Sequence, residues 1–283
     1  MDQFSLPKIS IITVCLNSEK HLERTIASVL SQAYQFTEYI IVDGGSTDRT
    51  LAIIDRYREH IDTLVSEPDN GIYDAQNKAI KLATGDIICI LNSDDRFYNE
   101  HVLERIVNCF AQEDVDFVYG DILFSSDSQD SEVCAVKFPE RLSKFYFLRG
   151  PLGHPSTFFR KRCFVKVGYY DTRYKISADY EWYLRALFKK GLRSAHLKEF
   201  IAIFQAGGTS DEKDLRRQET NAVLKQYFKP LELLAGKTIN FFLYGDILRF
   251  LGRVILRRKG YQYLRSISRR SNSKRYLRKG AKP

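Results

Sequence analysis

Apolar and polar residues follow two different rhythms along the first third of the chain. Short runs without a charged residue have the pattern of strands buried on both faces. These runs are residues 9–14, 39–42, 63–66 and 87–91. Between them, apolar residues recur at helical spacing over residues 22–30, 47–57 and 72–83. Strands that alternate with helices across short turns predict an α/β fold with a mainly parallel central sheet and helices on both faces.

The remainder of the chain has a less regular pattern. It predicts a helix, a strand, a polar loop, a loop rich in Gly and Pro, and two further helices. These are residues 100–110, 117–121, 125–132, 150–155, 179–189 and 211–228. The compact domain is expected to span residues 1–229, which leaves a tail over residues 230–283.

The excess of positive charge lies in the tail. The chain has a net charge of +9, but residues 229–283 contribute +13 and the preceding residues contribute −4. A mildly acidic body gives no reason to expect a nucleic acid as partner. An ordinary hydrophobic content of 44% excludes a disordered chain.

Cysteine usage and the absence of long apolar segments indicate the compartment. The five cysteines are widely scattered, without the spacing of a zinc site or a redox motif. No opening stretch has the pattern of a signal peptide, and no apolar run reaches the roughly 18 residues of a membrane span. We therefore expect a reduced, cytoplasmic protein.

The tail combines an apolar stripe with a charged stripe at helical spacing. The apolar stripe comprises Phe241, Tyr244, Leu248, Leu251 and Ile255. The charged stripe comprises Asp246, Arg249, Arg253 and Arg257. Such a helix, followed by more cations, is suited to an anionic membrane surface, here the cytoplasmic face of an inner membrane. The alternative, nearly as well supported, is that residues 233–256 pack on the globular domain or on a partner subunit and that the basic end is only solvated.

Acidic residues follow two predicted strands at their carboxyl ends. Asp43 follows residues 39–42, and the run from Asn92 through Ser93 and Asp94 to Asp95 follows residues 87–91. Ligands of open α/β sheets bind at this edge. Adjacent carboxylates repel unless a cation or hydrogen bonds offset their charge, and Mg²⁺ or Mn²⁺ prefers oxygen ligands. A solvated turn that caps a following helix explains the same run, and both interpretations stay open.

Asp179 and His154 are further candidates. Asp179 lies at the predicted start of a helix, where it is either a general base for an acceptor hydroxyl or a helix cap. His154 lies between Gly153 and Pro155 in a constrained loop, where it either contacts phosphate or acceptor or has a structural role.

In their order along the chain, these motifs resemble the inverting, GT-A type glycosyltransferases of family 2. The resemblance covers roughly residues 7–228 and is strongest to the bacterial branch of exopolysaccharide, colanic-acid and O-antigen synthesis. The residues that carry it are Ile11-Ile12-Thr13 with Asn17, Asp43-Gly44-Gly45-Ser46-Thr47-Asp48, the run from Glu67 to Lys78, Asp94, His154 to Arg160, Ser177-Ala178-Asp179-Tyr180-Glu181 and Gly207-Gly208.

The resemblance implies a role for each matching residue. Asp94 matches the last Asp of the family's Asp-x-Asp motif and is expected to bind Mg²⁺ or Mn²⁺, and Asp179 matches the catalytic base. The nucleotide-sugar is expected to contact Asp43, Asp69, Asn77, Lys78, Asn92, Ser93 and Asp94. The acceptor or the diphosphate is expected to contact His154, Glu181 and Trp182. Gly44 departs from the pattern, since many relatives have a second Asp there.

The implied activity is an inverting, metal-dependent transfer of a hexose from a nucleoside-diphosphate sugar, with a UDP-sugar favoured. The acceptor is a saccharide hydroxyl, expected to be lipid-linked, in bacterial surface polysaccharide synthesis. A non-catalytic module of the same fold that binds nucleotide-sugar or polysaccharide is the alternative. A dinucleotide-dependent oxidoreductase is excluded, because the turn at residues 15–19 contains no glycine.

Overall fold

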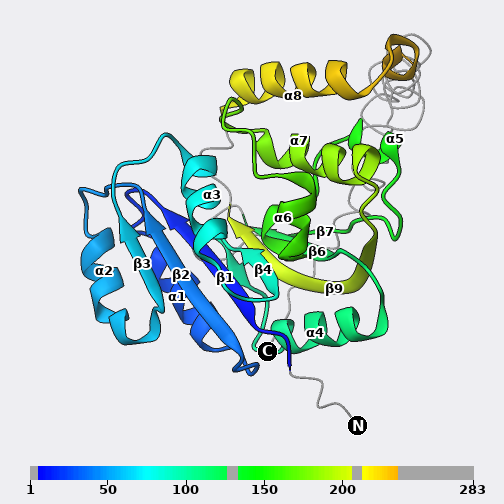
Figure 1. Cartoon of the computed structure of the whole chain (residues 1–283). Helices are drawn as coiled ribbons and strands as arrows, with labels where there is room; N and C mark the ends of the chain where they lie inside the picture. Colours follow the sequence, from blue (N-terminus) through cyan, green and yellow to red (C-terminus); the bar gives the residue numbers. More distant parts are fainter. Residues whose placement is uncertain (1–5, 126–132, 206–211, 235–283) are drawn as a thin grey trace, which may run out of the picture.

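The computed structural model describes residues 6–125, 133–205 and 212–234, shown as coloured ribbon in Figure 1. Three expectations fall outside these residues: the polar loop after Ser125, the motif Gly207-Gly208, and the tail beyond Leu234. Within the described ranges, no helix is both long enough and apolar enough to cross a bilayer.

The first half confirms the predicted alternation of strands and helices. Its elements are β1 (Ile9–Cys15), α1 (Leu22–Leu30), β2 (Thr37–Asp43), α2 (Thr50–Arg56), a 3₁₀ turn η1 (Arg58–His60), β3 (Thr63–Ser66), α3 (Ile72–Leu82) and β4 (Ile87–Ile90). The turn after β1 has no glycine because Asn17 adopts the left-handed conformation itself, with φ of +50°.

The second half contains more strands than its pattern predicts. Its elements are β5 (Arg96–Phe97), α4 (Val102–Gln112), β6 (Phe117–Ser125), β7 (Val133–Val136), α5 (Lys144–Phe147), η2 (His154–Ser156), β8 (Thr157–Arg160), α6 (Arg162–Val167), α7 (Ala178–Leu184), a π-helical turn η3 (Arg185–Lys189), β9 (Ser194–Gln205) and α8 (Lys213–Tyr227). Strands β5, β7, β8 and β9 were not expected, whereas the helices at α4, α7 and α8 were.

The strands form a single mixed sheet in the order β3-β2-β1-β4-β8-β6-β9-β5, with β7 paired to β6. Neighbours from β3 to β4 are parallel, and so are β6 and β9. Strand β8 is antiparallel to both β4 and β6. The α/β architecture is therefore as predicted, but a mainly parallel sheet describes only its first half.

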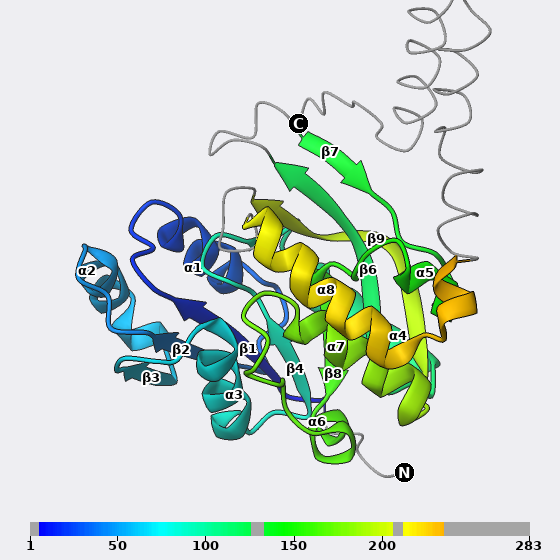
Figure 2. The ribbon, with the colours of Figure 1, turned by 90° about the horizontal axis from the view of Figure 1, so that it is seen from above.

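Two hydrophobic cores cover the two faces of the sheet. On one face, α3, α6 and α7 pack on side chains such as Ile12 and Ile40, and on the other, α1, α2 and α4 pack on side chains such as Ile11 and Ile41. Alternate residues of β1 and β2 thus face opposite cores, which explains their uninterrupted apolar runs. Helix α8 lies across α7 on the outside of the first core (Figures 1 and 2).

Strand register brings the candidate residues to one edge of the sheet. Cys15 of β1 pairs with Asp43 of β2, which pairs with Ser66 of β3. Cys89 of β4 pairs with Phe158 of antiparallel β8, so the start of β8 lies beside the end of β4. His154, just before β8, is therefore on the same edge as Asn92, just after β4.

A buried carboxylate ties the strands together at the opposite edge. Glu38 is 5% exposed and accepts hydrogen bonds from Ser10 Oγ at 2.5 Å, Thr84 N at 2.8 Å and Thr84 Oγ1 at 2.6 Å. Burial alone would raise the pKa of Glu38, but these hydrogen bonds and the charge of Lys8 lower it to about 2. The ionised form therefore stabilises the fold.

The loss of this stabilisation should be visible at acidic pH. Because the pKa of Glu38 is lower in the folded chain, its contribution is present above about pH 4.5 and disappears as the pH falls towards 2. Glu38→Gln should reduce the free energy of unfolding at pH 7 by about 1–3 kcal/mol and flatten its decline below pH 4.5. Urea denaturation at several pH values measures both effects. Glu59→Gln, at an exposed position, is the control, and equal pH profiles for Glu38→Gln and wild type would contradict the prediction.

Candidate functional site

Asp43, at the end of β2, organises the turn that follows it. Its side chain is fully buried, and Oδ1 accepts a hydrogen bond from Ser46 Oγ at 2.5 Å. Oδ2 accepts hydrogen bonds from Ser66 Oγ at 2.8 Å and from the Ser46 amide at 3.1 Å. The carboxylate thus holds the Gly-rich turn against β3, at the edge where the nucleotide is expected.

The Gly-rich turn leaves space for a second carboxylate. A Cβ atom at Gly44 would lie 2.4 Å from Asp69 Oδ2, so any larger residue would displace Asp69. Asp69 Oδ1 in turn accepts a hydrogen bond from the amide of Gly71 at 2.8 Å, which fixes the carboxylate over the turn. The departure at Gly44 therefore has a physical reason, because a side chain there and Asp69 in this position exclude each other.

The run after β4 does not cap a helix. Strand β5 begins at Arg96, and α4 begins only at Val102, with His101 as its N-cap. No side chain of the described ranges donates a hydrogen bond to Asp94. Burial raises the pKa of Asp94, and the charge of His21 offsets part of that rise. The cap interpretation of this run is therefore wrong, and Asp94 keeps its oxygens available for a ligand.

Asp95 adds a buried carboxyl group beside Asp94. It is fully buried, and its Oδ1 accepts a hydrogen bond from the Gln205 amide at 3.2 Å. Its Oδ2 has no hydrogen-bond partner among the described residues. Burial, followed by the charge of Asp94, raises the pKa of Asp95 well above its usual value. A positive charge near these two residues would stabilise both carboxylates.

This environment fits a divalent cation that takes few ligands from the protein. The described part of the chain contains no group of three or more His, Cys, Asp or Glu arranged as a metal site. Asp94 alone, with substrate phosphates and water as the other ligands, corresponds to the way in which proteins often bind Mg²⁺. Asn92 and Ser93 are held beside it: Gln76 Nε2 donates to Asn92 Oδ1 at 3.1 Å, and Ser93 Oγ lies 2.8 Å from Ser18 Oγ.

Asp179 lies at the second residue of α7 but does not cap that helix. Within the described residues its carboxylate contacts Tyr73, whose hydroxyl oxygen lies 2.8 Å from Asp179 Oδ1 and 2.7 Å from the carbonyl oxygen of Ile176. Burial, and then the charge of Asp179, raises the pKa of Tyr73 well above its usual value, so the hydroxyl keeps its proton. Asp179 Oδ2 has no partner among the described residues and remains able to accept a proton.

His154 and Asn77 both bind Tyr170 beside Asp179. His154 Nε2 lies 3.0 Å from the Tyr170 hydroxyl, and burial lowers the pKa of His154 against the opposing charge of Asp179. Asn77 is 8% exposed and uses its whole amide on the Tyr170 backbone, donating to its carbonyl at 2.9 Å and accepting from its amide at 3.0 Å. Lys78 instead pairs with Glu67, at 2.9 Å.

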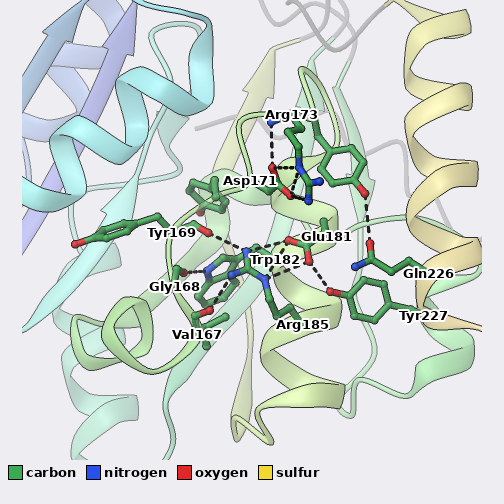
Figure 3. A network of polar contacts seen from close by, with 12 residues as sticks. Val167, Gly168, Tyr169, Asp171, Arg173, Glu181, Trp182, Arg185, Gln226 and Tyr227 are labelled. Carbon is green, nitrogen blue, oxygen red and sulfur yellow. Dashed lines mark hydrogen bonds and ion pairs between the residues drawn. The ribbon is translucent and has the colours of Figure 1, made fainter.

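Glu181 and Trp182 bind other parts of the fold. Glu181 is buried in a network with Arg185, whose Nη2 lies 2.9 Å away, and with the hydroxyl of Tyr227 on α8 (Figure 3). Trp182 has no exposed surface and donates from Nε1 to the carbonyl of Gly168 at 2.8 Å. Both side chains stabilise the fold, and their burial leaves them almost no surface for the expected contact with acceptor or diphosphate.

Sequence reasoning did not assign a role to Tyr73 or Gln76, although both lie in the run that carried the resemblance. Together with Asn77 they occupy one face of α3, at positions i, i+3 and i+4. Tyr73 contacts Asp179, Gln76 contacts Asn92 and Asn77 contacts Tyr170. One helix therefore links the loop of Asp94 to the candidate base, and helical spacing was the available signal.

Comparison with known proteins identifies the family. The model of "Glycosyl transferase family 2" matches residues 10–165, more than half of the chain. The chain belongs to glycosyl transferase family 2. An uncharacterised glycosyltransferase of Mycobacterium tuberculosis is 34% identical to this family-2 chain over 187 residues, which are 64% of the chain and 70% of that relative. A PGL/p-HBAD biosynthesis glycosyltransferase of Mycobacterium bovis is 30% identical over 210 residues, 72% of the chain and 80% of that relative.

Solved structures share the GT-A fold of this family-2 chain. Residues 1–349 of S. aureus TarS in complex with UDP-GlcNAc superpose with a TM-score of 0.62 at 18% identity, covering 89% of the chain and 77% of that structure. The mannosyltransferase PcManGT of Pyrobaculum calidifontis, in complex with GDP-Man and Mn²⁺, gives 0.63 at 17% identity, covering 95% and 81%. These likenesses establish the fold.

Proposed function

We propose that this family-2 glycosyltransferase moves a sugar from a nucleoside-diphosphate sugar to an acceptor hydroxyl, with inversion at the anomeric carbon. One observation carries the proposal. Through Tyr73 and Gln76, helix α3 contacts both Asp179, whose Oδ2 has no hydrogen-bond partner among the described residues, and Asn92 in the loop of Asp94. Asp179, the proposed proton acceptor, and the loop of Asp94, the proposed ligand of the cation, are thus both linked to the same helix.

Asp179 is the proposed general base. Tyr73 holds Oδ1, and Oδ2 accepts the proton of the acceptor hydroxyl as that oxygen attacks the sugar. A well-placed base of this kind contributes about 10²–10⁴-fold to a rate. A single displacement requires only one carboxylate at the reacting carbon, unlike the facing pair of a glycoside hydrolase. His154 is proposed to bind the acceptor or the diphosphate near Asp179.

The donor is proposed to bind along the strand ends from β2 to β4. Asp94 would hold Mg²⁺ or Mn²⁺, which when bound offsets the negative charge that develops on the departing diphosphate. Asp43, Asp69, Lys78, Asn92 and Ser93 would contact the nucleotide-sugar, and Asn77 would act through Tyr170. A UDP-sugar is favoured. UDP-GlcNAc and GDP-Man, the ligands of the two solved structures, are the first donors to test.

Asp94→Ala should abolish metal-dependent release of nucleoside diphosphate without unfolding the chain. Loss of the only proposed protein ligand should lower turnover by at least about 10²-fold, a typical loss when a charge stabiliser of a transition state is removed. The assay measures UDP or GDP release from a panel of donors, with Mn²⁺, with Mg²⁺ and with chelator. Asp55→Ala, at an exposed position of α2, is the control. Full activity of Asp94→Ala, or of the wild type in the presence of chelator, would show that Asp94 does not bind a required metal ion. If wild type releases no nucleotide from any donor, the non-catalytic binding module is favoured.

Asp179→Asn should lower kcat by about 10²–10⁴-fold while the affinity for UDP and Mn²⁺ stays close to that of wild type. Asn preserves the volume and can still accept a hydrogen bond from Tyr73, but it cannot take a proton. Calorimetric titration with UDP and a thermal melt show whether the donor site and the fold are intact. Wild-type turnover in Asp179→Asn would exclude the base role.

We also propose that the enzyme binds an anionic membrane surface, where a lipid-linked acceptor of bacterial surface polysaccharide synthesis would be presented. The support lies where the tail leaves the described domain. Phe145, Leu231 and Leu234 are 51%, 76% and 61% exposed, respectively. Lys144 of α5 pairs with Glu232 at 3.0 Å, which holds two of these apolar regions together. Exposed apolar residues next to a segment of charge +13 suit a lipid interface.

Full-length protein should sediment with vesicles that contain phosphatidylglycerol and remain in solution with pure phosphatidylcholine. Each cation near an anionic surface contributes about 1 kcal/mol, so binding should weaken steeply as salt is added. A chain that ends at Leu234 should lose most of the binding, and Phe145→Ser with Leu231→Ser in the full chain should weaken it. If the full-length protein does not sediment with anionic vesicles at low salt, the membrane proposal is wrong and packing of the tail on protein is favoured.

A further inference from the structure

Glu219, in the middle of α8, binds the backbone of the segment that leads into α7. Its Oε1 accepts a hydrogen bond from the amide of Lys175 at 2.6 Å. Its Oε2 accepts hydrogen bonds from the amides of Ile176 and Ser177, both at 2.9 Å. Bonds to an ionised carboxylate are stronger than neutral ones, and three successive amides on one carboxylate define the path of the chain. Asp179 follows two residues later.

The same segment is tied to the donor side of the molecule. Lys175 Nζ donates a hydrogen bond to the carbonyl oxygen of Asn70 at 3.0 Å, next to Asp69. The carbonyl oxygen of Ile176 lies 2.7 Å from the Tyr73 hydroxyl that also contacts Asp179. The segment 175–177 therefore lies between α8, the loop of Asp69 and α3, and Glu219 supplies its contact on the α8 side.

Helix α8 is itself anchored, which fixes the position of Glu219. Glu219, Val223 and Tyr227 lie on one face of the helix, at positions i, i+4 and i+8. Val223 is fully buried in the core, and the Tyr227 hydroxyl donates a hydrogen bond to Glu181 of α7 (Figure 3). Figures 1 and 2 both show α8 lying across α7. Packing therefore presents the Glu219 carboxylate to the amides before α7.

We propose that Glu219 is the positioning residue for the base: it fixes residues 175–177 and thereby the place of the Asp179 carboxylate. This inference rests on the proposed role of Asp179. Without the Glu219 carboxylate the three amides would bind water, and the start of α7 would gain freedom. A displacement of the base by about 1 Å is enough to cost about 10²-fold in rate. The effect should appear mainly in kcat, because the three amides that Glu219 binds lie within four residues of the base.

Hydrogen exchange tests the structural part without any substrate. Glu219→Ala should accelerate exchange at the amides of residues 175–177 by at least tenfold, while amides of β1, β2 and β4 keep the rates of wild type. Asp214→Asn is the matched control, because it removes one negative charge from an exposed position of the same helix. Unchanged exchange at residues 175–177 would overturn the inference.

Kinetics test the functional part. The rate of UDP or GDP release, with water as acceptor and Mn²⁺ present, is measured for the donor of the panel that wild type hydrolyses fastest. Glu219→Ala should lower kcat by about 10–100-fold with little change in KM or in the affinity for UDP. Glu219→Gln, which keeps one acceptor oxygen and the volume of the side chain, should lose less. If Glu219→Ala retains wild-type kcat, the inference is wrong.

A double variant separates positioning from general stability. If Glu219 acts only through the base, Glu219→Ala should slow the Asp179→Asn enzyme by less than about twofold, because there is no base left to position. A purely structural role would instead multiply the two losses, which would overturn the inference. Wild-type activity in Asp179→Asn would refute the proposed base, a different outcome from the failure of Glu219 to affect an active base.

Discussion

The antiparallel pairing of β8 with β4 is the constraint on which the site depends. Strand β4 has parallel β1 along one side and antiparallel β8 along the other. This reversal brings the start of β8 to the carboxyl end of β4, so that His154 and Asn92 share one edge of the sheet with Asp43. If β8 were instead parallel to β4, the residues just before β8 would lie at the opposite edge of the sheet. The second half of the chain can therefore approach the strand ends that the first half provides.

The first half of the fold was predictable because β1, β2 and β4 are buried on both faces. A strand that is buried on both faces is apolar at every position, as at residues 39–42 and 87–91, whereas an amphipathic helix has polar residues on its exposed face. The strand β9 could not be found in the same way. It is largely half-buried, carries Lys198 and Glu199, and shifts register against β6 around Asp121. Its pairing depends on a partner about 80 residues earlier, which no local pattern records.

The site residues also differ in how far the sequence could place them. Asp43 and Asp94 could be placed from sequence, because the ends of parallel strands meet at one edge. The contacts of Tyr73 and Glu219 with residues near Asp179 span about 40 to 100 positions of the chain and appear only once it is folded. Glu181 and Trp182 were misjudged for a simpler reason. Glu181, two positions after Asp179, is rotated by roughly 200° about the helix axis and so lies on another face. Trp182, three positions after it, is rotated by only about 60° from Asp179 but is fully buried in the core.

The family model ends at residue 165, before the segment that holds the proposed base. Strand β9 joins the two parts by pairing with β6 and β5, and polar links such as Tyr73 with Asp179, Asn77 with Tyr170, and Lys175 with Asn70 join them near the candidate site. A chimaera that takes everything after residue 165 from a relative would give the proposed base new surroundings while keeping Asp43 and Asp94 on their own strands. Such an exchange must preserve the edges of β5 and β6 that pair with β9, and near the site a hydroxyl at 73, an amide at 77 and the carbonyl of residue 70.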